Sequence, residues 1–75
     1  MTVQYRVSFG KNDEAVEGPD DADVVVTIAS SDAGVDPTVA YMQGKLKSSG
    51  STATLFEVLR SGDAATVISR LASRP

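Results

Sequence analysis

The first half of the chain alternates apolar and polar residues with a period of two. Residues 2–9 place β-branched and aromatic side chains on one side, and residues 22–29 repeat the alternation around three consecutive valines. Such alternation is typical of strands with one buried face, and the valines indicate a central strand partly covered on both faces. Residues 14–17, after turn residues 10–13, are polar enough for an edge strand. The inward positions of the first strand are Val3, Tyr5, Val7 and Phe9.

Helical signals dominate the second half of the chain. Asp36 is a good N-cap, Pro37 a good first helical residue, and Gly44 a good residue just past the helix end. Residues 45–49 then alternate again, which predicts a short strand with Leu46 directed inward and its neighbouring lysines outward. Residues 30–34 are expected to be a loop.

Two amphipathic helices are predicted after this strand. Ser51 can cap the first of them, and residues 61–63 end it and cap the second. The predicted apolar faces are Thr52, Leu55, Phe56 and Leu59 in the first helix, and Val67, Ile68 and Leu71 in the second. The order of elements predicts one α+β domain over residues 1–75: a small, mainly antiparallel sheet of about four strands with two to three helices on one face.

Composition disfavours several kinds of function. The chain of 75 residues has no cysteine, no histidine and a net charge of −3. It therefore has no thiolate metal ligand and lacks the commonest general base, and its acidity argues against nucleic acid as a partner. We expect no catalytic residue, no metal, no cofactor and no enzymatic activity. No apolar run approaches the roughly 20 residues that span a bilayer, and no signal segment is evident, so a cytoplasmic location is predicted.

Charge is unevenly distributed along the chain. Residues 12–44 contain eight acidic residues and no lysine or arginine, whereas the balance from Lys45 onward is positive. The ordinary interpretation is that these side chains are solvated turns and faces. The alternative is a weakly basic C-terminal half that meets an acidic partner or an anionic head group.

Residues 21–59 contain an ordered series of local motifs. A strand ends in an aspartate-containing loop at residues 24–32, and a Tyr41-Met42 helical turn leads through Gly44 into a Lys-Leu-Lys strand and a turn at Gly50. This series resembles the sterol carrier protein family of nonspecific lipid-transfer domains, and the block MQGKLKSSG is its most specific part. The resemblance implies that fold, and a role in carrying sterols, fatty acids or acyl-CoA without chemistry.

The chain departs from the family pattern in two places. Family domains begin with a helix and a further strand that would precede Val3, and they carry a helix where this chain has only Ala33-Gly34-Val35. Both helices normally help to wall the lipid tunnel. The resemblance therefore implies a short form that keeps the sheet and the C-terminal helices.

An apolar groove between the sheet and the helix starting at Ser51 is the predicted binding site for a fatty acyl or sterol-like lipid. The predicted lining residues are Met42, Leu46, Leu55, Phe56 and Leu59, and Lys45 or Lys47 is expected to meet the head group. The same apolar residues also suit a plain core. The alternative function is a protein-interaction or dimerisation module that docks on an enzyme of lipid or polyketide metabolism. A homodimer is expected because a missing first strand leaves a sheet edge open.

Overall fold

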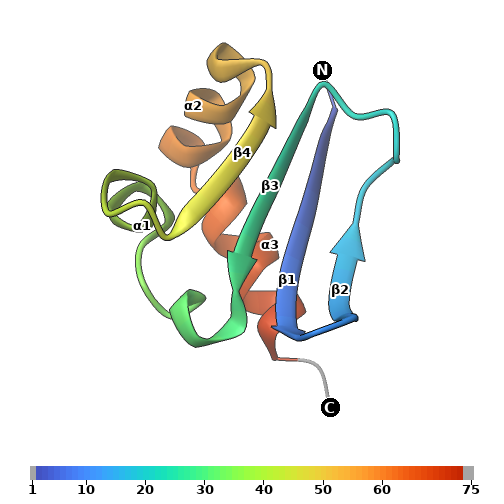
Figure 1. Ribbon diagram of the computed structural model, residues 1–75. Helices are drawn as coiled ribbons and strands as arrows, with labels where there is room; N and C mark the ends of the chain where they lie inside the picture. The colour runs from blue at the N-terminus through green and yellow to red at the C-terminus, as the bar shows by residue number, and fades with distance from the viewer. Residues whose placement is uncertain (1, 74–75) are drawn as a thin grey trace.

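Figure 1 shows a four-stranded sheet with the helices packed on one face, in a computed structural model that describes residues 2–73. The strands are β1 (Val3–Gly10), β2 (Asp13–Glu17), β3 (Val24–Ala29) and β4 (Leu46–Gly50). The helices are α1 (Pro37–Met42), α2 (Thr52–Ser61) and α3 (Asp63–Ala72). The predicted α+β fold is confirmed. The predicted loop after β3 instead begins with a 3-10 turn, η1 (Ser30–Asp32).

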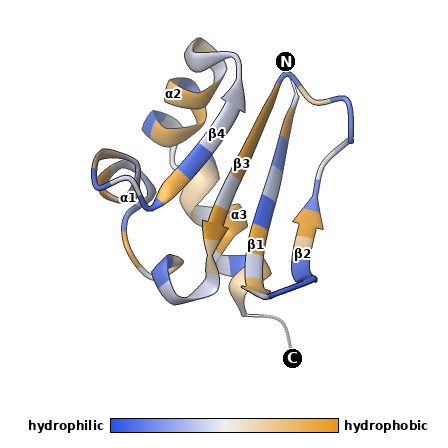
Figure 2. Ribbon diagram, in the orientation of Figure 1, coloured by the Kyte–Doolittle hydropathy of each residue, from blue (hydrophilic) through white to orange (hydrophobic). Residues whose placement is uncertain are grey.

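The strand order is β2-β1-β3-β4, so the two long strands lie in the centre of the sheet. β1 pairs antiparallel with β2 and parallel with β3, and β4 pairs antiparallel with β3. The sheet is therefore mainly antiparallel, as predicted, with one parallel pair at its centre. In Figure 2 apolar colour runs along much of β3, whereas β1 alternates between apolar and polar residues.

The core lies between the sheet and the helices. Tyr5 and Val7 of β1 are buried there, and Val3 and Phe9 pack against them, so the predicted face of this strand is correct. α3 lies against β1 and β2, α2 against β3, and α1 against β4. The buried apolar residues are Tyr5, Val7, Val24, Val26, Ile28, Ala40, Leu46, Leu55, Ala64, Val67 and Ile68.

Within residues 2–73 no helix covers the opposite face of the sheet, yet Gln4 on that face is only 1% exposed. Its amide Nε2 donates a hydrogen bond to Asp20 Oδ1 at 3.0 Å, and its Oε1 accepts one from Arg6 Nε at 2.8 Å. Arg6 in turn forms an ion pair with Glu14 at 2.7 Å. This polar network joins β1 to β2 and to the loop before β3, and it satisfies the hydrogen-bonding groups of a buried amide.

The predicted helix caps of α1 and α2 are confirmed. Asp36 Oδ1 accepts from the Thr38 N–H at 2.9 Å, and Ser51 Oγ accepts from the Thr54 N–H at 3.3 Å. Gly44 follows α1 with a φ of +75°, a conformation that glycine adopts at little cost.

The junction between α2 and α3 differs from the prediction. The two helices meet at residues 61–63 as predicted, but the N-cap of α3 is Gly62, with a φ of +86° and no side chain, and the Asp63 N–H donates to Ser61 Oγ at 3.3 Å. Asp63 lies in the first turn of α3, and its Oδ2 accepts a hydrogen bond from the Tyr5 hydroxyl at 2.9 Å. The contact joins the start of α3 directly to the central strand β1. Asp63 therefore acts as a tertiary contact rather than as a cap.

We expect the Tyr5–Asp63 contact to make stability fall at alkaline pH. Burial and the hydrogen bond to Asp63 raise the pKa of the Tyr5 phenol above its ordinary value of 10.0. Because the folded-state pKa lies above the unfolded one, this stabilisation is fully present below about pH 10 and is lost as the pH rises further. Tyr5→Phe should lower the free energy of unfolding by about 1 kcal/mol at neutral pH. It should also reduce the loss of stability at alkaline pH, which urea unfolding measures. Equal losses of stability at alkaline pH in wild type and Tyr5→Phe would contradict this expectation. Tyr41→Phe is the control variant.

Gly50 marks a close approach of backbone to backbone. A Cβ built on Gly50 would lie 2.1 Å from the carbonyl oxygen of Asp23, and the φ of Gly50 is +110°. The same oxygen accepts a hydrogen bond from the Ser51 N–H at 2.9 Å, so the backbone cannot simply move away. We expect Gly50→Ala to lower the free energy of unfolding by about 2 kcal/mol or more. A Cβ at Gly34 would meet open space, so Gly34→Ala is the matched control. A similar loss of stability in both variants would refute the steric explanation.

Candidate functional site

Two of the five predicted lining residues lie inside the core. Leu46 of β4 is 2% exposed and Leu55 of α2 is 1% exposed. Both belong to the same buried apolar cluster as Val26 and Ile28 of β3. In this conformation they contact other core side chains and present almost no surface to a ligand.

Two others lie on the surface. Met42, at the last position of α1, is 74% exposed, and Phe56 of α2 is 51% exposed. The Phe56 ring packs edge-on against Tyr41 of α1, with ring centroids 5.8 Å apart and an interplanar angle of 90°. Leu59, the fifth residue, is partly buried against the core. The predicted residues are thus divided between the protein interior and the outer surface where α1 meets α2.

The predicted apolar face of α2 is correct at Leu55 and Leu59, which lie against the core, and wrong at Thr52 and Phe56. Thr52 and Phe56 are exposed, whereas Thr54 and Leu55 are buried and Val58 packs against the core. The side of α2 that faces the core therefore runs through positions 54, 55, 58 and 59. The sequence pattern does not indicate this side of the helix, because Thr54 on it is polar. Phe56, which is large and apolar, lies on the exposed side instead. The predicted face of α3 is correct, since Val67 and Ile68 are buried and Leu71 packs against the core.

The two lysines lie outside the core, as predicted. Lys45 lies just before β4 and approaches Asp32 at 3.9 Å, with its side chain 47% exposed. Lys47 pairs in register with Thr27 and lies on the sheet face opposite that of Leu46. Lys45 therefore lies three positions after the end of α1, whereas Lys47 lies on the sheet face opposite the helices.

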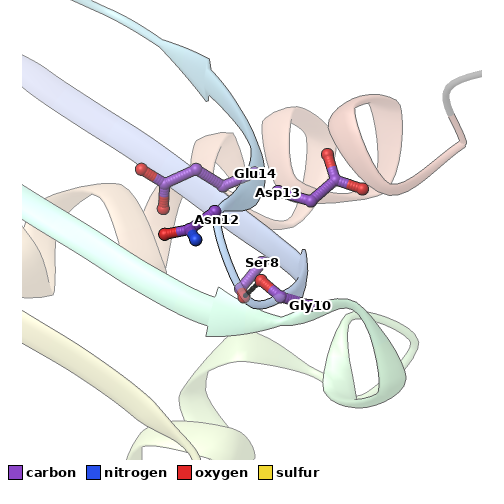
Figure 3. A pocket seen from close by; sticks show the side chains of 5 residues that line it. All are labelled: Ser8, Gly10, Asn12, Asp13 and Glu14. Atoms are coloured by element: carbon purple, nitrogen blue, oxygen red, sulfur yellow. Dashed lines mark hydrogen bonds between the residues drawn. The ribbon is translucent and has the colours of Figure 1, made fainter.

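Two hollows are formed elsewhere on the molecule. One, of about 380 Å³, lies at the β1–β2 turn and is shown in Figure 3; it is lined by Ser8, Gly10, Asn12, Asp13 and Glu14. The carboxylates of Asp13 and Glu14 point to different sides in that view, so they do not converge on a common point. The other, of about 300 Å³, lies between residues 33–37 and the outer surface of α3. Neither hollow includes a predicted lining residue.

Two features are absent from residues 2–73. No group of three or more acidic side chains is arranged there to hold a metal ion. None of the helices described has the length and apolarity needed to cross a membrane.

Comparison with known proteins adds information on the fold. No family model and no curated protein sequence matches the chain. Among solved structures, it is similar to the apo form of sterol carrier protein 2 from Yarrowia lipolytica. The TM-score is 0.50 and the identity 16%, over 97% of this chain and 70% of that chain. This likeness confirms the sterol-carrier-like fold, and at this identity it shows the fold alone. Family membership stays a prediction.

We expect truncation of the two neighbouring apolar residues of α2 to have unequal effects. Leu55→Ala removes a fully buried side chain and should lower the free energy of unfolding by about 2–5 kcal/mol. Phe56→Ala removes a half-exposed ring and one aromatic contact, and should cost about 1 kcal/mol. Thermal and urea unfolding of both variants measures the difference. Equal losses would show that the helix face is oriented as the sequence pattern predicted.

Proposed function

We propose that this protein binds an apolar molecule, a fatty acyl chain or a sterol-like lipid, without chemistry. The binding site is the surface where α1 meets α2. We call this the α1–α2 apolar surface and define it as Tyr41 and Met42 of α1 with Phe56 and Leu59 of α2.

The exposure of large apolar side chains on this surface is the observation that carries the proposal. Among residues 2–73, four large apolar residues are exposed: Val16, Val39, Met42 and Phe56. Three of the four belong to α1 and α2, the helices joined by the Tyr41–Phe56 contact. Single exposed apolar residues are normal, and we propose that Met42 and Phe56, on the two helices that meet at the Tyr41–Phe56 contact, act together as one binding surface.

The packing of the interior indicates how deep a ligand can lie. Because Leu46 and Leu55 are closed off by the core, a ligand that reaches them must displace α2 from β3. A ligand that stays on the surface contacts Met42 and Phe56 on one side only. Each fully buried methylene contributes about 0.8 kcal/mol to the binding free energy. A chain buried on one side only therefore binds more weakly than an enclosed chain.

A polar head group has two candidate cations. Lys45 follows α1 closely, since its N–H donates to the carbonyl of Ala40 at 2.8 Å. Lys47 is exposed on the other face of the sheet. We propose Lys45 as the closer partner of a carboxylate or phosphate at the rim, with Lys47 as the more distant one. The 3.9 Å contact of Lys45 with Asp32 is a partly exposed ion pair that contributes little stability. Lys45 can therefore leave Asp32 to contact a head group.

The fold supports the same proposal. The structural neighbour named above is called a sterol carrier protein, and a carrier needs an apolar contact surface but no catalytic group. The proposed activity of this chain is therefore reversible binding.

A protein-interaction or dimerisation module is the second candidate. β2 and β4 each pair with only one neighbour in the sheet, and an edge strand can pair with another chain. Sedimentation at micromolar concentration distinguishes the candidates: a stable dimer without bound lipid supports the module, and a 7.8 kDa monomer that retains lipid in native mass spectrometry supports the carrier.

Titration with a fluorescent fatty acid tests the carrier proposal. We expect saturable binding by wild type, and several-fold weaker binding by Met42→Gln and by Phe56→Ala because each removes apolar contact area. Lys45→Gln should reduce the salt dependence of binding more than Lys47→Gln. Val16→Thr, which changes an exposed apolar residue on β2, is the matched control and should bind like wild type. Absence of saturable binding by a folded wild-type protein would overturn the proposal.

A further inference from the structure

The sulfur chemistry of this chain is confined to two side chains. The sequence has no cysteine and two methionines, and Met1 lies outside the described residues. Met42, the last residue of α1, is 74% exposed, a larger fraction than that of Val16, Val39 or Phe56. An accessible thioether reacts with peroxide to give methionine sulfoxide. Met42 is therefore the oxidisable sulfur of residues 2–73, and it lies open to solvent.

The core offers an oxidant no comparable target. Its buried apolar side chains are those of valine, isoleucine, leucine, alanine and tyrosine, none of which contains sulfur. The sequence also has no tryptophan. Peroxide at a concentration that oxidises methionine therefore changes the described part of the molecule at one surface side chain and leaves the core chemically intact.

The end of α1 is held in place without the Met42 side chain. The N–H of Gln43 donates to the Val39 carbonyl at 3.0 Å, and the N–H of Lys45 donates to the Ala40 carbonyl at 2.8 Å. These hydrogen bonds are made by the backbone, so an oxygen atom added to the Met42 sulfur breaks neither of them. Oxidation should therefore change the surface of the protein without unfolding the helix.

Oxidation makes this apolar side chain polar. The Met42 sulfur attacks one oxygen of hydrogen peroxide, the O–O bond breaks, and the sulfur keeps the attacked oxygen while the other oxygen leaves as water with both protons. The sulfur is oxidised by two electrons and the peroxide is reduced by two. The product is a polar, chiral sulfoxide. Its oxygen is a hydrogen-bond acceptor that loses its water when an acyl chain covers it, which costs free energy.

From these observations we propose that Met42 is a reversible oxidation site, and that formation of its sulfoxide by peroxide weakens binding of an apolar molecule at the α1–α2 apolar surface. The inference rests on the proposed function and adds to it a reaction that controls release. The reverse step uses a methionine sulfoxide reductase and a dithiol: the sulfoxide oxygen leaves as water, the thioether returns, and the dithiol becomes a disulfide. Because the chain has no cysteine, another molecule must supply the dithiol.

Binding before and after peroxide treatment tests the proposal. The fluorescent fatty acid titration is carried out on untreated protein and on protein in which peptide mass spectrometry shows that Met42 is fully converted to the sulfoxide. We expect the oxidised protein to bind several-fold more weakly, as is expected of Met42→Gln, which also replaces the thioether by a polar group. Circular dichroism and urea unfolding should be the same in both forms. Treatment with the two methionine sulfoxide reductases, one for each sulfur epimer, should restore the affinity.

Three variants separate oxidation of Met42 from other effects of peroxide. Met42→Leu is compared with its own untreated form, and peroxide should leave its affinity unchanged, whatever that affinity is. In Met42→Leu combined with Val16→Met, peroxide oxidises an exposed methionine on β2, at the other edge of the sheet from β4, and the affinity should again stay the same. Leu55→Met is a core substitution of similar volume. Its introduced methionine should be oxidised at least about tenfold more slowly than Met42, because Leu55 is 1% exposed.

The results separate failure of the inference from failure of the proposed function. Absence of saturable binding by untreated wild type would overturn the proposed function, and this inference with it. Saturable binding that is unchanged in the fully oxidised protein would overturn the inference alone, as would an equal loss of affinity in peroxide-treated Met42→Leu. Unfolding of the oxidised protein, or equal oxidation rates of Met42 and of the methionine introduced by Leu55→Met, would also overturn it.

Discussion

The parallel pairing of β1 with β3 is the contact on which the rest of the structure depends. It places Tyr5 opposite Val26 and Val7 opposite Ile28, and these four buried side chains form the middle of the core. β2 pairs with β1 and β4 pairs with β3, so each edge strand is connected to the other half of the sheet through this central pair. The two strands are joined through β2 and the following loop, so their pairing must overcome the loss of chain entropy before the helices have a surface to cover.

Local signals were sufficient to predict the elements and the side of the sheet that the helices cover. The two-residue period of β1 and the cap residues Asp36 and Ser51 act over a few positions, and the structure follows them. The parallel pair was not predictable in this way because register between distant strands depends on tertiary packing. The burial of Gln4 was not predictable from the sequence either, because its hydrogen-bond partner Asp20 lies 16 residues away along the chain.

The candidate site was predictable only in part. Met42 and Phe56 were identified as apolar residues of interest, but periodicity alone could not tell that they face solvent while Leu46 and Leu55 face the core. A helix with a threonine on its buried face and a phenylalanine on its outer face gives a misleading apolar stripe. The contact between Tyr41 and Phe56 was not predicted, because it depends on which helices meet.

The single residue between α2 and α3 has a mechanical consequence. Gly62 has a φ of +86°, and no other residue separates the two helices. Asp63 follows immediately and is held to β1 by the Tyr5 hydroxyl. At its other end α2 is joined to β4 through Ser51, whose N–H donates to the Asp23 carbonyl at 2.9 Å. Helix α2 is therefore held at both ends, by β3 and β4 at Ser51 and by α3 at Gly62, and Leu55 lies against the core between these two fixed points.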